Sequence, residues 1–193
     1  MLRRIYDWTM GLAGHRHALP ALGLVSFIES SVFPVPPDVM IIPMVLANRA
    51  RAWLIAGVTT VTSVLGGLAG YAIGAFLFES VGRPLLAFYG YGEQFARFQD
   101  QYNEWGAWIV ALAGVTPFPF KVITIASGVT GLDLATFTVA ALLARGARFY
   151  IEAALLWKFG PPIRDFIENN LAVLTTIFFA LLFGGFVAVK YLV

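Results

Sequence analysis

The sequence contains no cysteine and only two histidines in 193 residues. Without cysteine the chain has no disulfide, no thiolate nucleophile and no thiolate metal site. His15 and His17 flank an arginine with no third ligand nearby, a pattern more typical of a polar interfacial loop than of a zinc site. We therefore expect neither a metal ion nor a cofactor.

Charged residues are also scarce. They make up 12% of the chain against 59% hydrophobic residues, and the mean hydropathy is +0.78. This balance is typical of an integral membrane protein and not of a soluble globular domain. The net charge of +2 is small and the basic residues are spread along the chain. The composition therefore argues against a nucleic-acid-binding protein.

Enzyme motifs are missing as well. The sequence has no P-loop, no Rossmann fingerprint and no serine in a nucleophile-elbow pattern. An enzyme is therefore the weaker hypothesis for this chain.

Apolar segments of spanning length are present. Residues 52–78 and 171–189 are uncharged runs long enough to cross a membrane as helices. Residues 133–157 have the right length but contain Arg145, Arg148 and Glu152, whose spacing places them on one helix face that must point inward. Residues 1–17 begin like a signal peptide but lack its apolar core, so we expect them to stay attached and lie at the interface.

Two further apolar segments, residues 18–48 and 105–132, are each interrupted near the middle by prolines. At about 1.5 Å per residue, each arm is too short to cross a membrane. The two interruptions align in register, and each segment precedes a long helix. Such a pattern predicts an inverted repeat of two re-entrant helical hairpins, whose tips meet near the midplane. The prolines at the tips are Pro34, Pro36, Pro37, Pro117 and Pro119.

Most basic residues outside the hairpins fall on the side from which the first hairpin enters, so the positive-inside rule makes that side cytoplasmic. Between the two halves, residues 79–104 carry aromatic residues at alternating spacings of three and four. This predicts an amphipathic helix in the interface plane, although a plain connector packed on the bundle fits the pattern equally well.

Three glycines on the 52–78 helix, Gly66, Gly70 and Gly74, fall four residues apart. Small residues at this spacing allow two helix backbones to approach closely, so we expect them to serve helix packing.

Six ionisable residues lie within the apolar segments, where an isolated charge costs at least about 2.5–3.5 kcal/mol, so they should face one another. They are Glu29, Asp38, Lys121, Arg145, Arg148 and Glu152. Structural ion pairs that hold the hairpins to the bundle are one explanation. A functional site is the other, since ionisable residues at this depth usually serve function.

Lys121 suggests what such a site would bind. It lies just after the prolines of the second hairpin, where a cation is repelled by the helix dipole unless an anion is bound there too. We expect Lys121, Arg145 and Arg148, with Glu152 on the same face, to bind a phosphate headgroup. Glu29 or Asp38, desolvated but near arginine, is then the candidate for proton exchange.

The sequence resembles the DedA family, also called VTT or SNARE-associated proteins, and its shorter bacterial branch in particular. The resemblance covers about residues 18–157 and rests on Glu29-Ser30-Ser31 with the following prolines and Asp38, the glycine-rich helix, and the hairpin from Pro117 to Gly128. It implies a flippase or scramblase of the cytoplasmic membrane that moves phospholipid or polyprenyl phosphate, with proton coupling in some members and functional acids at Glu29 and Asp38.

The chain departs from the family in its second hairpin, where members carry two arginines. Lys121 occupies one of these places, and no basic residue lies near Gly114 or Val115 at the other. Arg145 or Arg148 is the candidate to supply the missing charge.

We therefore predict an all-α polytopic membrane protein, a single domain over residues 1–193, in the inner membrane of a bacterium. Its two re-entrant hairpins are each followed by a transmembrane helix, with an interfacial amphipathic helix and a C-terminal transmembrane helix in addition. The expected function is lipid transport, with phosphate lipids and protons as partners. The alternatives are a proton-coupled antiporter of small cations or drugs, and a membrane enzyme or scaffold acting on phosphate lipids. The sequence leaves open the lipid, the direction of transport and whether the chain forms a homo-oligomer.

Overall fold

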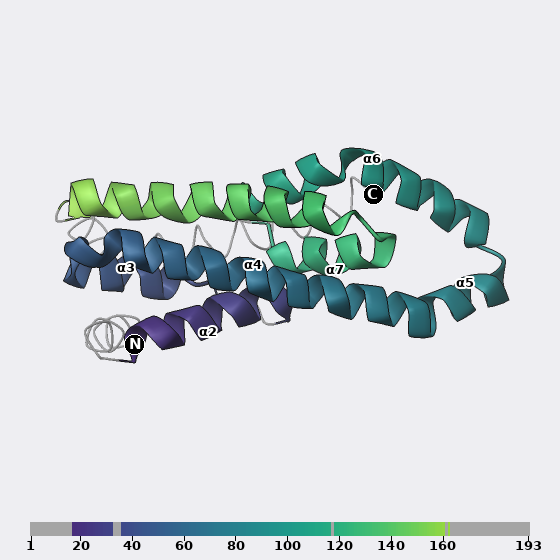
Figure 1. The fold of residues 1–193 in the computed structure, drawn as a ribbon, viewed down its shortest axis with the longest axis horizontal. Helices are drawn as coiled ribbons and strands as arrows, with labels where there is room; N and C mark the ends of the chain where they lie inside the picture. The colour runs from purple at the N-terminus through teal and green to yellow at the C-terminus, as the bar shows by residue number, and fades with distance from the viewer. Residues whose placement is uncertain (1–16, 33–35, 117, 161, 163–193) are drawn as a thin grey trace.

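The computed structural model describes residues 17–32, 36–116, 118–160 and 162 (Figure 1), and in these residues the chain is helical with no strand. This confirms the all-helical class. The expected C-terminal helix at 171–189 and nearly all of the N-terminal segment lie outside the described residues. The elements in chain order are α2 (Ala18–Ser31), α3 (Asp38–Ala47), a 3₁₀ turn (Arg49–Arg51), α4 (Ala52–Leu77), a π-helical turn (Phe78–Gly82), α5 (Arg83–Tyr89), α6 (Gly92–Val115), α7 (Phe120–Thr130) and a last helix over residues 134–160.

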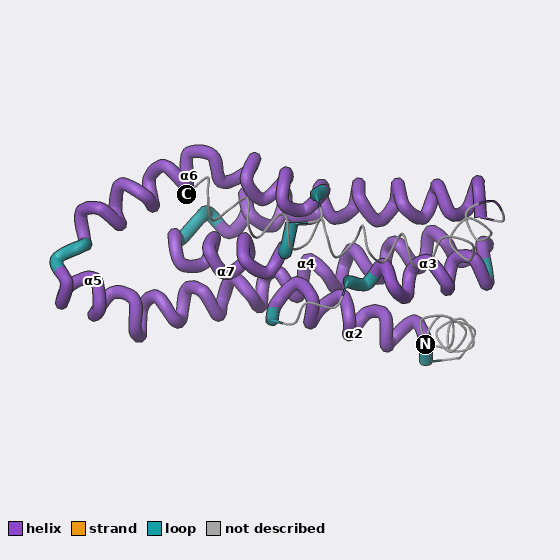
Figure 2. The backbone as a smooth tube through the Cα atoms, turned by 180° about the vertical axis from the view of Figure 1, so that it is seen from behind, coloured by secondary structure: helices purple, strands orange, loops and turns teal. Residues whose placement is uncertain are grey.

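Two helix pairs approach the middle of the molecule from opposite ends (Figures 1 and 2). α2 runs inward and α3 returns to the end from which α2 started, whereas α6 runs inward from the other end and the shorter α7 turns back toward that end. Pro37 and Pro119 are the N-caps of the two returning helices. Proline suits the start of a helix because its missing N–H has no helical partner to lose. The position of these pairs in a membrane stays a prediction.

α4 is the main part of the longest continuous helix in the described residues. It continues through the π-helical turn and α5 as one helix from Arg49 to Tyr89, and it is the single helix in the described part that is long and apolar enough to cross a membrane by length and composition. It ends at Gly90, whose φ of 72° places it in the left-handed region that glycine adopts without steric cost.

The region 79–104, expected as a separate connector helix, is divided differently. Residues up to Tyr89 prolong α4, and residues from Gly92 onward begin α6, which runs without a break into the second helix pair. The chain around Trp105 has no proline and only the isolated Gly106, so nothing ends the helix there. The expected boundary at residue 105 is therefore absent.

The glycines of α4 lie where the two helix pairs press against it. A Cβ atom at Gly66 would collide with the backbone carbonyl of Phe27 on α2, and one at Gly74 would collide with that of Ile125 on α7. Gly70 lies between them and faces α7 as well as α2. α4 is therefore the spine on which both pairs pack at backbone distance.

Two apolar cores form, one beside each helix pair. The first joins α2, α3, the start of α4 and the end of the last helix, and the second joins α6, α7, the later part of α4 and the start of the last helix. Buried polar residues occupy the level between them. On α4 these are Thr59, Thr60 and Ser63, and on the last helix the corresponding residue is Arg145.

Candidate functional site

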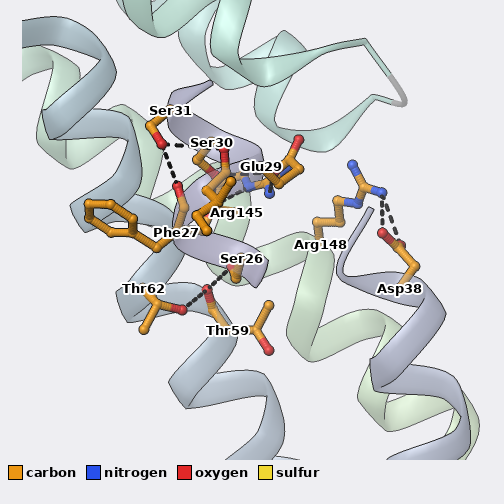
Figure 3. A network of polar contacts seen from close by, with 12 residues as sticks. Ser26, Phe27, Glu29, Ser30, Ser31, Asp38, Thr59, Thr62, Arg145 and Arg148 are labelled. Atoms are coloured by element: carbon orange, nitrogen blue, oxygen red, sulfur yellow. Dashed lines mark hydrogen bonds and ion pairs between the residues drawn. The ribbon is translucent and has the colours of Figure 1, made fainter. Parts of the chain in front are cut away.

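Charged side chains from three elements meet at the level between the two cores (Figure 3). Glu29 lies in the last turn of α2 and Asp38 is the first residue of α3. Arg145, Arg148 and Glu152 follow one another along the last helix at intervals of three and four residues, so they share a face as the sequence spacing indicates.

Arg145 forms the deepest ion pair of the site. Its guanidinium lies 2.7 Å from the Glu29 carboxylate, and its side chain is only 1% exposed against 14% for Glu29. Its Nε also donates to the Ser63 hydroxyl at 2.7 Å. The guanidinium lies over the rings of Phe120 and Phe149, with centroids at 4.9 and 4.6 Å. Hydrogen bonds and aromatic faces thus replace the water that the cation lost on burial.

The neighbouring hydroxyl groups tie this ion pair to both helix pairs. Ser30 donates to the Glu29 carboxylate at 3.1 Å, and its hydroxyl lies 2.8 Å from that of Ser63. The Ser30 carbonyl accepts a hydrogen bond from Thr124 of α7 at 3.1 Å. The end of α2 and the start of α7 are therefore joined directly, and a movement of either changes the surroundings of Glu29.

Arg148 forms a second and more accessible ion pair. Its Nη2 donates to both oxygens of Asp38, at 3.0 and 3.2 Å, and its Nη1 donates to the Thr116 carbonyl at 3.2 Å. The Arg148 and Asp38 side chains are 23% and 27% exposed. One guanidinium thus connects the first turn of α3 with the turn that ends α6, and a small ligand can reach it more easily than Arg145.

Glu152 lies one helical turn beyond Arg148 and is partly buried. Its carboxyl group lies beside that of Asp38 and interacts with both arginines. The site therefore contains three carboxyl groups (Glu29, Asp38, Glu152) and two guanidinium groups, and −3 and +2 give a net charge of −1 when all are ionised.

Lys121 takes part in neither of these ion pairs. It is the second residue of α7 and partly buried, and within the described part of the chain its side chain has no hydrogen bond or ion pair. Both acids at the tips take an arginine and not Lys121 as their partner. The structure therefore brings five of the six predicted charges together, and of the three cations among these six only Lys121 has no ion pair.

Several residues of the site were not anticipated from the sequence. Ser63 and Thr116 hold the arginines, and Phe120 and Phe149 flank Arg145. A signal exists for Ser63, because three hydroxyl residues at 59, 60 and 63 interrupt an otherwise apolar helix on one side. Pro34 and Pro117 lie outside the described residues, and no group of His, Cys, Asp or Glu in the described part is able to hold a metal ion.

Comparisons with known proteins identify the family of the chain. The sequence model of the VTT domain matches residues 35–158. The chain is similar to an uncharacterized protein of Haemophilus influenzae, with 39% identity over 168 residues that cover 85% of this chain and 87% of the relative. An uncharacterized protein of Histophilus somni is 37% identical over the same shares. No solved structure matches the chain.

Proposed function

We propose that this chain, which belongs to the VTT domain family, also called the DedA family, moves lipids with phosphate headgroups between leaflets. Members of this family are membrane proteins commonly linked to membrane transport or lipid-related functions. The proposed setting is the bacterial inner membrane, with both helix pairs as re-entrant hairpins and the chain crossing several times. The lipid is a phospholipid or a polyprenyl phosphate.

The observation that carries this proposal is the Arg148 ion pair. Arg148 is part-exposed and contacts both helix pairs at their turns, through Asp38 and the Thr116 carbonyl. A guanidinium binds phosphate oxygens with two parallel hydrogen bonds, in the same geometry in which it binds a carboxylate. A phosphate headgroup is therefore a natural competitor of Asp38 for this arginine. Lys121, uncommitted among the described residues, is available as a second cation for the same headgroup.

The Arg145 pair has a different part in this proposal. Its guanidinium is enclosed by Glu29, Ser63 and two aromatic rings, so a headgroup reaches it only after the site opens. Glu29 and Asp38 are the proposed proton-exchanging acids. Of the two, Asp38 is the one that a headgroup at Arg148 leaves without its counter-charge.

A second candidate function follows from the net charge. Five clustered groups that sum to −1 favour a cation as much as an anion, which suits a proton-coupled antiporter of small cations or drugs. Such a transporter needs the acids but does not need Arg148 to leave Asp38.

Purified protein in vesicles separates the candidates. We expect fluorescent phospholipids and a polyprenyl phosphate analogue to change leaflets at a rate that depends on the headgroup, with and without a pH gradient. Ion flux without lipid movement supports the antiporter, and release of inorganic phosphate supports an enzyme. The matched control is Arg83→Gln, because Arg83 forms an exposed i,i+4 pair with Glu79 outside the site. Equal flipping by vesicles with and without protein contradicts the proposal.

A further inference from the structure

The cluster contains three carboxyl groups and two guanidinium groups, so one carboxyl group has no arginine of its own. Glu29 is held by Arg145 and Asp38 by Arg148. Glu152 forms no salt bridge within the described part, and it lies one helical turn beyond Arg148, whose guanidinium holds both oxygens of the Asp38 carboxylate. The two carboxyl groups therefore lie at the same guanidinium, and Asp38 is among the charges that act on Glu152. Two carboxylates that share a partly buried site repel each other, and this repulsion is relieved when one of them takes up a proton.

We propose that Asp38 and Glu152 share one exchangeable proton, and that this proton is bound together with an anionic phosphate group at Arg148. The inference rests on the proposed function for the identity of the anion, but it concerns binding and not movement across the membrane. The charges that face Glu152 are Asp38 on α3 and Arg145 and Arg148 on its own helix, while Glu29 on α2 is engaged by Arg145.

The linkage between anion and proton follows from the geometry. Asp38 and a phosphate compete for the same guanidinium, so binding of the phosphate removes the nearest cation from both Asp38 and Glu152. A phosphodiester headgroup adds one negative charge to a cluster that already carries −1, and one proton restores the original total. The proton moves from solvent to a carboxylate oxygen of the pair, and no other bond changes.

Thermodynamic reciprocity gives the sign of the effect. If anion binding strengthens proton binding, then a lower pH strengthens anion binding by the same factor. Uptake of one full proton per anion corresponds to about tenfold tighter binding for each pH unit by which the pH is lowered.

Glu152→Gln tests the role of the pair, because the amide has the shape of a protonated carboxyl group and cannot ionise. We expect this variant to bind short-chain phosphatidylglycerol at neutral pH as tightly as the parent binds it in acid, with the pH dependence largely gone. The matched control Glu79→Gln, an exposed acid outside the site, should keep the parent's pH dependence. A Glu152→Gln protein with an unchanged pH dependence overturns the proposal.

A second measurement does not depend on the variant's folding. Calorimetric titration of the parent with the same lipid, in buffers of different ionisation enthalpy, counts the protons taken up on binding. We expect net uptake that approaches one proton, and binding without uptake at any pH overturns the inference while leaving lipid binding intact. A parallel titration with inorganic phosphate shows whether the free anion suffices. If neither ligand binds, both the shared-proton inference and the phosphate site of the proposed function are wrong. If the lipid binds but does not move between leaflets, only the transport function is wrong.

Discussion

Replacing Glu29 with glutamine would remove the carboxylate from a guanidinium that has no access to solvent. Arg145 is 1% exposed, and its Nη2 lies 2.7 Å from the carboxylate oxygen that would be lost as a charge. Breaking a buried ion pair by removing one partner costs about 3–5 kcal/mol, because the remaining charge is stranded. Glutamine keeps one acceptor oxygen and Ser63 keeps its hydrogen bond to Arg145, so we expect a loss near the lower end, about 3 kcal/mol.

The matched substitution is Asp38→Asn, which weakens a pair whose members are 23% and 27% exposed. Pairs near the surface contribute about 0–1 kcal/mol, because water and salt screen them. For a chain of this size 1 kcal/mol corresponds to about 2–4 °C, so Glu29→Gln should lower the melting temperature by about 6–12 °C and Asp38→Asn by at most about 4 °C. Thermal unfolding of purified protein in detergent, followed by circular dichroism, measures both.

A double substitution separates the ion pair from other effects at Glu29. In Glu29→Gln with Arg145→Met neither charge remains to be stranded, so the combined loss should be clearly smaller than the sum of the two single losses. Strict additivity, or equal small shifts for Glu29→Gln and Asp38→Asn, would refute the argument that Arg145 and Glu29 form the structural pair and Arg148 and Asp38 the accessible one.

Three further experiments test the rest of the structure. Arg148→Gln should abolish headgroup-dependent flipping in vesicles while the melting temperature stays within about 4 °C of the parent, and flipping at the parent rate would remove Arg148 from the transport site. Gly66→Val should prevent stable folding, because its Cβ meets the Phe27 carbonyl, whereas Gly92→Ala, with open space around the new methyl group, should leave size-exclusion and melting behaviour unchanged; two equally stable proteins would contradict the packing described for α4. His17→Cys and Asn48→Cys, in a chain without native cysteine, should react with an impermeant maleimide from the same side of the membrane, and labelling from opposite sides would show that α2 and α3 do not form a re-entrant hairpin.

The helix breaks were predictable because their signals are local. Proline at the start of a helix acts through its own backbone, so the tips at Pro37 and Pro119 follow from the sequence. The end expected for the 52–78 helix is too early, because the chain continues as helix through α5 to the glycine C-cap at Gly90. No such local signal lies at residue 105, and the helix boundary expected there is absent. A change from charged to apolar composition alters the surroundings of a helix but does not interrupt its hydrogen bonds.

The pairing of charges was only half predictable. The spacing of Arg145, Arg148 and Glu152 fixes their common face. Because an unpaired charge in an apolar segment raises the free energy, each of them is expected to have a partner of opposite charge. Which arginine takes which acid depends on how far α2 and α3 reach along the last helix, and that depends on contacts between helices far apart in the sequence, such as that of Gly66 with the Phe27 backbone. That both acids pair with an arginine and not with Lys121 was equally beyond the sequence.

The layer of hydroxyl groups between the two apolar cores has a mechanical consequence. Interlocked methyl groups resist sliding, because any shift opens voids and loses contacts on both sides. Hydroxyl groups such as Ser30 and Ser63, 2.8 Å apart, can exchange hydrogen-bond partners over a small rotation with little change in packed volume. At the level of Ser30 and Ser63 the contact between α2 and α4 can therefore adjust without opening a void, while α4 and the last helix cross this level unbroken. A small shift of α2 there changes the hydrogen bonds around Glu29 while the apolar cores keep their contacts.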